Sequence, residues 1–255
     1  MRVALYQMDV LWLQPAENLK NIQTVCAQIS GKADILILPE MFATGYVLDT
    51  DLLAIEWQKE IIKGLMELCF DFQLIISGSI PFFHEGKWFN KMITVDASGL
   101  IHEYDKIHLF SPAGEDKNYT KGDKISVWNV GEWKVLPLIC YDLRFPDVSF
   151  SGEMPDIIIY AANWPESRIH HWDVLLKARA IENQCYVIGV NRVGTDENGY
   201  VYPGHSAVYD YMGDQLLSVG KNKNFDVAVL DFESVKECRK KLPFQNDRNT
   251  YAFRS

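Results

Sequence analysis

Two kinds of apolar segment alternate along the chain. Short continuous runs without helical spacing predict buried strands, and these runs occupy residues 2–8, 35–40, 74–81, 135–140 and 155–165. Segments whose apolar residues recur every three or four positions predict amphipathic helices, and these cover residues 16–29, 51–70, 170–184 and 233–242. A strand, a helix and a second strand thus come early in the chain, which is typical of a βαβ unit.

The later part of the chain adds hairpins to this alternation. Residues 88–96 and 100–107 predict two arms joined by a turn at Ala97, Ser98 and Gly99. Residues 110–123 are rich in turn-forming residues and predict a loop. No linker or low-complexity segment interrupts residues 1–255, so we expect a single α/β domain with helices outside its sheets.

Composition excludes several classes of function. The chain has 25 basic and 34 acidic residues, a net charge of −9, and no dense lysine or arginine run. We therefore expect no nucleic-acid or membrane partner. The first apolar stretch is interrupted by Asp9, which argues against a signal peptide, and no run reaches membrane-spanning length. We expect a cytoplasmic protein.

The cysteines point away from a zinc site or a redox dithiol. There are five, and no Cys-x-x-Cys pair occurs among them. His170 and His171 are adjacent, and neighbouring residues on a helix point in different directions, so we expect no metal site there. Cys185 is expected to be a buried core residue.

Chemically reactive side chains follow three of the predicted strands. Glu40, Lys106 and Cys140 each end one of them. Singly, each has an ordinary explanation, as a helix cap, a solvated lysine and a small core residue. Open α/β folds place their chemistry at strand ends. We therefore expect Cys140 as nucleophile, Glu40 as base, and Lys106 with the backbone N–H of Tyr141 as oxyanion donors.

Three blocks carry a resemblance to a known family. The segments PEMFATGY (39–46), YDKIHLF (104–110) and ICYDLRFP (139–146) occur in that order, and residues 163–194 and 204–213 add further similarity. These blocks resemble the signatures of the nitrilase superfamily of carbon–nitrogen hydrolases. The resemblance implies a four-layer αββα sandwich that pairs into homodimers or larger assemblies. It also implies the same roles for the Glu, Lys and Cys positions, with no metal and no cofactor.

Two further site residues are expected. Glu115 lies seven residues before Gly122, similar to the family's second glutamate, whose implied role is to orient the lysine. Arg168 follows the strand at 155–165, and an arginine binds a carboxylate bidentately. We expect it to contact the substrate, with an exposed loop arginine as the alternative. Arg144 and Arg179 are expected in buried ion pairs, with a position that reaches the site as the alternative.

The resemblance leaves the substrate open. The chain looks most similar to omega-amidases, which release ammonia from 2-oxo-acid amides. An N-carbamoyl amino acid hydrolase, an aliphatic amidase and a nitrilase share the same three residues. A catalytically silent binding or assembly protein is a different class, and the intact Glu–Lys–Cys set argues against it. A nucleotide-binding domain has little support because no glycine-rich phosphate loop occurs.

Two smaller expectations concern the turn after Cys140 and the C-terminal tail. Asp142 is expected to stabilise that turn. Aromatic residues in the tail, Tyr251 and Phe253, are expected to dock onto another subunit.

Overall fold

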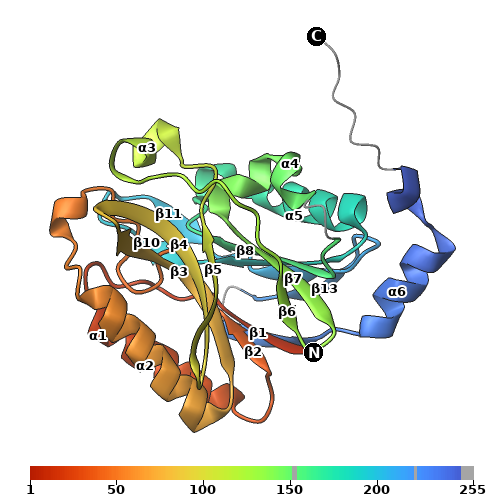
Figure 1. The fold of residues 1–255 in the computed structure, drawn as a ribbon, viewed down its shortest axis with the longest axis horizontal. Coiled ribbons are helices and arrows are strands. Elements are labelled where there is room, and N and C mark those ends of the chain that lie inside the picture. Colours follow the sequence, from red (N-terminus) through yellow and green to blue (C-terminus); the bar gives the residue numbers. More distant parts are fainter. Residues whose placement is uncertain (151–153, 221–222, 248–255) are drawn as a thin grey trace.

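The computed structural model describes residues 1–150, 154–220 and 223–247. Two six-stranded sheets pack face to face, and helices cover their outer faces (Figure 1). The architecture is the expected α/β sandwich. The expected tail contacts of Tyr251 and Phe253 lie outside the described residues.

The first sheet has the strand order β14-β1-β2-β3-β4-β5. Its strands are β1 (Arg2–Tyr6), β2 (Ile35–Ile37), β3 (Ile75–His84), β4 (Lys87–Asp96), β5 (Gly99–Asp105) and β14 (Phe225–Val229). β1, β2 and β3 run parallel, and the long hairpin of β3 and β4 continues antiparallel into β5. The chain's first and last described strands pair with each other.

The second sheet has the order β13-β12-β9-β8-β7-β6. Its strands are β6 (Trp128–Val130), β7 (Trp133–Ile139), β8 (Ile157–Ala162), β9 (Tyr186–Asn191), β12 (Ala207–Tyr209) and β13 (Gln215–Ser218). β7, β8 and β9 run parallel, so their carboxyl ends share one edge of the sheet. A separate hairpin, β10 (Val193–Thr195) and β11 (Val201–Pro203), follows β9.

The helices form the outer layers. The longer ones are α1 (Pro15–Ile29), α2 (Trp57–Phe72), α5 (Ile169–Asn183) and α6 (Phe232–Lys241), and α3 (Glu115–Asn118) and α4 (Pro146–Ser149) are short. The 3-10 turns are η1 (Thr50–Leu52), η2 (Ser111–Ala113), η3 (Cys140–Arg144), η4 (Glu166–Arg168) and η5 (Phe244–Asp247). α1 and α2 bury their apolar faces on the first sheet, and α5 packs on β9 of the second. Within the described residues, no helix is both long and apolar enough to span a membrane.

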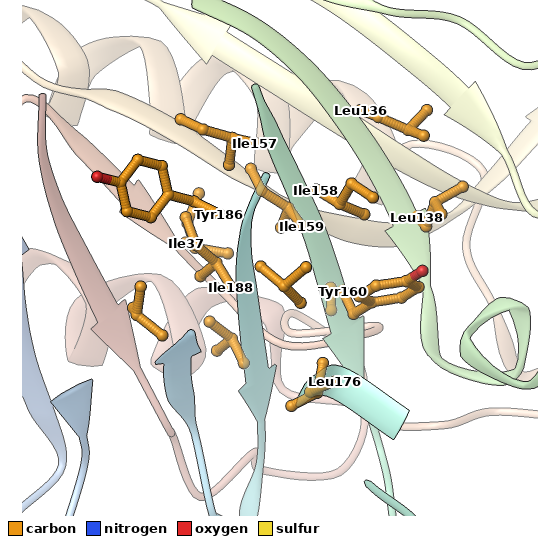
Figure 2. Packing of buried hydrophobic residues seen from close by; sticks show 14 of the residues in the cluster. Ile37, Leu136, Leu138, Ile157, Ile158, Ile159, Tyr160, Leu176, Tyr186 and Ile188 are labelled. Atoms are coloured by element: carbon orange, nitrogen blue, oxygen red, sulfur yellow. The ribbon is translucent and has the colours of Figure 1, made fainter. Parts of the chain in front are cut away.

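The core lies between the sheets and continues beneath α5. Successive side chains of a strand point to opposite faces of the sheet. Every residue of β8 is buried, so both faces of this strand are covered, and its residues are apolar throughout. Figure 2 shows Ile159 of β8 in one cluster with Ile37 of β2 and Leu176 of α5. Because both faces of β8 are covered by protein, the strand reads as a continuous apolar run in the sequence.

Three boundaries differ from the sequence prediction. The helix expected over 51–70 begins at Trp57, because η1 takes the preceding residues. The loop expected over 110–123 contains η2 and the one-turn helix α3. The strand expected over 185–194 divides into β9 and β10, with Arg192 between them.

Candidate active site

A cavity of about 230 Å³ opens where several strands end, and its size suits a small molecule. Five of the residues expected from the sequence line it: Glu40, Lys106, Cys140, Tyr141 and Arg168. Glu115, the sixth, is buried and contacts Lys106. The structure thus brings together residues that lie more than a hundred positions apart.

The topology explains this meeting. Glu40 follows β2, Cys140 follows β7 and Asn163 follows β8, so each comes from the carboxyl end of a parallel strand. Lys106 follows β5, at the end of the antiparallel arm of the same sheet as Glu40. With the sheets packed face to face, these ends converge on one cavity.

Cys140 stands at a strained backbone turn. Its φ is +43°, in the left-handed region that residues with a Cβ rarely adopt. The carboxylate of Asp142 holds this turn, because its Oδ2 accepts hydrogen bonds from Ile139 N at 3.1 Å and from Tyr104 Oη at 2.8 Å. The expected role of Asp142 in stabilising the turn is confirmed. The side chain of Cys140 lines the cavity.

Lys106 lies between two carboxylates. Its Nζ is 2.8 Å from Glu40 Oε1 and 2.8 Å from Glu115 Oε2, and all three side chains are buried. Burial by itself lowers the pKa of Lys106, but the charges of Glu115 and Glu40 outweigh it and raise this pKa. Lys106 therefore remains a fixed positive charge at neutral pH.

Glu115 is a buried part of this cluster and not an exposed loop acid. Burial opposes its charge, yet Lys106 together with hydrogen bonds from Asn90, Lys106 and Phe110 N lowers its pKa. Tyr46 Oη donates to the same carboxylate at 3.0 Å. Glu115 is thereby ionised and fixes the position of the ammonium group.

Two asparagines that sequence reasoning missed complete the cluster. Asn90 Nδ2 donates to Glu40 Oε1 at 2.8 Å and to Glu115 Oε1 at 2.9 Å. Asn163 donates to Glu40 Oε2 from its backbone N at 3.0 Å and from Nδ2 at 3.3 Å. Asn163 follows an apolar strand as Glu40 does, so the same sequence pattern predicts a site residue at this position. Asn90 lies inside β4, where the sequence carries no comparable signal.

The thiol of Cys140 is protonated at rest. Desolvation in the cavity and the negative charge of Glu40 raise its pKa well above the usual value, while Lys106 acts in the opposite direction. Its Sγ lies 3.9 Å from the carbonyl oxygen of Asn163. A nucleophilic thiolate here must therefore form as the thiol loses its proton to a nearby base.

Two arginines also line the cavity. The guanidinium of Arg168 lies 5.5 Å from the ring centre of Phe110, and that of Arg144 lies 4.7 Å from the ring centre of Trp164. Arg144 Nη2 also approaches His171 Nδ1 at 3.2 Å. Within the described ranges, neither guanidinium pairs with a carboxylate. This leaves both charges available to an anionic ligand.

The prediction of a buried ion pair for Arg144 is wrong. Arg144 follows the Cys140 turn directly, and that turn directs it into the cavity rather than into the core. Arg179 does form the expected pair, with Glu182 at 2.7 Å, and its Nη2 donates to Leu143 O. The two arginines differ because Arg179 lies on the sheet-facing side of α5.

The hairpin of β10 and β11 forms another wall that the sequence did not reveal. Asp196, Tyr200 and Tyr202 from this hairpin line the cavity. Asp196 accepts hydrogen bonds from Tyr202 Oη and from Tyr200 N, which fixes the turn. The hairpin is anchored below by Arg192, whose guanidinium packs on the ring of Tyr202.

No metal-binding group is found among the described residues, where three or more His, Cys, Asp or Glu side chains never gather in a suitable arrangement. His170 and His171 lie in the first turn of α5, and His171 faces Arg144. The chemistry available in the cavity is that of a thiol, a carboxylate base and a fixed ammonium group.

The fold and the cavity together define an α/β enzyme whose cavity holds a cysteine beside a buried ammonium and two carboxylates. The chain belongs to the carbon-nitrogen hydrolase family, whose sequence model matches residues 2–240. The expected family and the expected sandwich fold are both confirmed.

Relatives extend over nearly the whole chain. The omega-amidase YafV of Escherichia coli K12 is 34% identical over 252 residues, which is 98% of each chain. The 2-oxoglutaramate amidase of Bacillus subtilis 168 is 32% identical over 258 residues, 96% of each. Among solved structures, a CN-hydrolase superfamily protein from Xanthomonas campestris has a TM-score of 0.92 at 30% identity and covers 100% of this chain and 99% of its own.

Proposed function

We propose that this enzyme is an omega-amidase, which hydrolyses the carboxamide of a small 2-oxo acid and releases ammonia. The observation that carries the proposal is the lining of the cavity, which the thiol cluster shares with two arginines that pair with no carboxylate among the described residues. A substrate with an amide at one end and a carboxylate at the other fits this layout. The relatives called omega-amidase and 2-oxoglutaramate amidase support it.

In the first half-reaction, the thiol of Cys140 attacks the amide carbon and its proton passes to Glu40. The carbonyl π electrons move to oxygen, and the resulting oxyanion is stabilised by Lys106 and by the backbone N–H of Tyr141. Protonated Glu40 then gives its proton to the nitrogen, the C–N bond breaks, and ammonia leaves. A thioester remains on Cys140.

In the second half-reaction, water attacks the thioester. Glu40 is a carboxylate again after the first step, so it accepts a proton from this water. Collapse of the second tetrahedral intermediate breaks the C–S bond, returns the proton to sulfur and releases the acid. Glu115 takes part by holding the ammonium of Lys106 in place.

Arg168 and Arg144 are proposed to bind the carboxylate of the substrate. Both are half-buried, line the same cavity and pack against aromatic rings. A guanidinium held against a ring is already oriented, and it matches the two oxygens of a carboxylate. A simple aliphatic amide or a nitrile lacks this anion and leaves the arginines unpaired.

The test is mass spectrometry of enzyme quenched during turnover of 2-oxoglutaramate. An acyl adduct is expected on the peptide that contains Cys140 and on none of the peptides that contain Cys26, Cys69, Cys185 or Cys238. Cys140→Ala is expected to abolish turnover and to keep the fold, because alanine occupies less space at the same position. Near-normal turnover by Cys140→Ala would rule out the mechanism.

A substrate panel tests the reaction independently of the mechanism. Ammonia release is expected to be fastest with 2-oxo-acid amides and slower with aliphatic amides, N-carbamoyl amino acids and nitriles. Preference for an N-carbamoyl amino acid would replace the proposed substrate and keep the thiol chemistry. Absence of turnover with every member of the panel would favour a binding protein.

We also propose that the enzyme forms a homodimer or a larger assembly. Val174 and Ile181 lie seven positions apart on α5, on one face of that helix, and are about half exposed. Met212 adds an exposed apolar side chain in the turn after β12, and the adjacent Gly213 lies against Ile181. A second copy that covers this face would bury all three side chains.

A single domain and a cytoplasmic location complete the proposal. All five cysteines are free thiols, and four of them are buried. A nucleophilic cysteine needs to stay reduced, which the cytoplasm provides.

A further inference from the structure

The carboxylate of Glu40 has no vacant acceptor site. Its Oε1 accepts from Lys106 Nζ at 2.8 Å and from Asn90 Nδ2 at 2.8 Å. Its Oε2 accepts from Asn163 N at 3.0 Å and from Asn163 Nδ2 at 3.3 Å. A carboxylate has about four lone-pair sites, so these four hydrogen bonds occupy them. A base in this condition takes up a proton only after one donor has left.

The donor most easily lost is Nδ2 of Asn163. Its contact with Glu40 is the longest of the four, and hydrogen bonds weaken as they lengthen. Lys106 is fixed by Glu115 as well, and Asn90 bridges both carboxylates. The backbone N–H of Asn163 cannot move without moving the end of β8. Nδ2 of Asn163 also donates to the backbone carbonyl of Glu40 at 2.9 Å, so it keeps a partner when it leaves Oε2. The contact between the Asn163 amide and Oε2 is therefore the exchangeable one.

The same amide has an unused acceptor. Asn163 Oδ1 is buried and has no hydrogen-bond partner within the described residues, although its side chain is nearly as enclosed as the core, at 8% exposure. A buried acceptor without a partner is costly, and such groups often serve in catalysis. Asn163 lines the cavity beside Cys140, whose Sγ approaches the Asn163 carbonyl. A carboxamide substrate brings N–H donors to this place.

We propose that Asn163 is a catalytic residue of the amidase reaction, which releases Glu40 for proton transfer and accepts an N–H of the substrate's carboxamide on Oδ1. The inference rests on the proposed amidase function and extends it. The thiol proton moves to Glu40 Oε2 as the S–C bond forms. It then passes to the nitrogen that Asn163 Oδ1 holds, the C–N bond breaks, and ammonia leaves.

An ester substrate separates this role from a structural one, because an ester has no N–H. The experiment compares Asn163→Ala with the unchanged enzyme on glutaramate and on monomethyl glutarate. Ammonia is measured for the amide and methanol for the ester. The ratio of the two kcat/KM values does not depend on the fraction of enzyme that is folded, so partial misfolding does not obscure the result.

Asn163→Ala is expected to reduce kcat/KM for the amide about ten- to a hundredfold more than for the ester, the range for one lost hydrogen bond in the transition state. Asn163→Ser keeps a shorter group that accepts and donates, and it is expected to restore part of the amide preference. Asn191→Ala is the matched control. Asn191 ends the neighbouring strand β9, and among the described residues its side-chain amide binds only the backbone of Trp164 and Gly204. It is expected to leave the amide-to-ester ratio unchanged.

Equal losses on amide and ester in Asn163→Ala would overturn the inference and leave Asn163 as a support for Glu40. A changed ratio in Asn191→Ala as large as that in Asn163→Ala would overturn it as well. If the unchanged enzyme released no ammonia from glutaramate, 2-oxoglutaramate or any other primary amide, the proposed function would fail and this inference with it. Turnover of amides with an unchanged ratio would remove the inference alone.

Discussion

At the scale of single residues, the site depends on charges that are buried together. Lys106 lies between Glu40 and Glu115, and the three form a cluster with one excess negative charge. Such a cluster is tolerated because neutral donors fill the remaining sites, above all Asn90, which touches both carboxylates. Burial and the negative charge of Glu40 together raise the pKa of the Cys140 thiol.

Arg168→Met tests the carboxylate-binding part of the site. The variant loses a bidentate donor and is expected to raise KM for 2-oxoglutaramate about ten- to a hundredfold, with a smaller effect on kcat. Propionamide has no carboxylate and serves as the control substrate, on which the variant should resemble the unchanged enzyme. An unchanged KM for 2-oxoglutaramate would show that Arg168 does not bind this group.

At the scale of elements, the close packing of α5 on β9 determines how this helix covers the outer face of the second sheet. Gly189 of β9 faces Trp172 and Leu176 of α5, and a Cβ at this glycine would lie 2.7 Å from Trp172 Cζ2 and even closer to Leu176. Both α5 side chains are completely buried. The glycine therefore allows the helix to approach the sheet closely.

Gly189→Ala is expected to lower the free energy of unfolding by about 1–3 kcal/mol, the usual cost of overpacking a core. Urea unfolding measures this change. Gly220→Ala is the matched control, because a Cβ there meets no atom within 4 Å and the glycine does not have a positive φ. If the two variants were equally stable, α5 would accommodate the added methyl group at position 189 without a loss of free energy of unfolding.

At the scale of the whole molecule, the two sheets bring distant parts of the chain into one site. Glu40 and Asn163 are 123 positions apart and share three direct hydrogen bonds between the sheets' edges. The interior between the sheets is apolar, so the charged cluster is confined to the end of the sandwich. The stability of the sandwich and the ionisation of the cluster are consequently linked.

Stability is expected to depend on pH through Glu115. Its pKa is lowered in the folded state, so its contribution is complete above the unfolded value, about 4.3, and is lost as pH falls through the folded value. Glu115→Gln is expected to lower the free energy of unfolding at pH 7 by about 3–5 kcal/mol, the cost of breaking a buried ion pair. Urea unfolding at pH 7, at pH 5 and at a pH of roughly 3, below the unfolded value, is the measurement.

The difference in free energy of unfolding between Glu115→Gln and the unchanged enzyme should shrink as the pH is lowered below about 4, because the Glu115 carboxylate of the unchanged enzyme then becomes protonated and neutral. Glu132→Gln, at an exposed position, is the control and should follow the unchanged enzyme throughout. A difference for Glu115→Gln that stays constant with pH would mean that Glu115 contributes by packing and not by its charge.

The proposed assembly is tested on the exposed face of α5. The double variant Val174→Asp and Ile181→Asp introduces charges that a second copy would have to bury, and it is expected to be monomeric at micromolar concentration by light scattering. Phe70→Asp is the control on α2, in the other outer layer, where the side chain is 68% exposed. A monomer in the unchanged enzyme, or an intact dimer in the double variant, would contradict the proposal.

The sequence by itself determined the strands, the main helices and the residues at the strand ends. Buried parallel strands appear as apolar runs because both of their faces meet protein, and helices show their one apolar face by spacing. Glu40 and Cys140 follow such apolar runs. Lys106 ends a strand of mixed polar and apolar residues, and its expected role came from the three strand ends taken together and from the family resemblance. Their catalytic roles remain predictions.

Only the tertiary structure decided the rest of the site. Asn90 lies inside β4, and nothing in its local sequence shows that two carboxylates approach it from other strands. Arg144 and Arg179 look alike in sequence, but the Cys140 turn directs one into the cavity while α5 buries the other. These contacts join residues far apart in the chain, and local pattern carries no information about which distant elements will pack together.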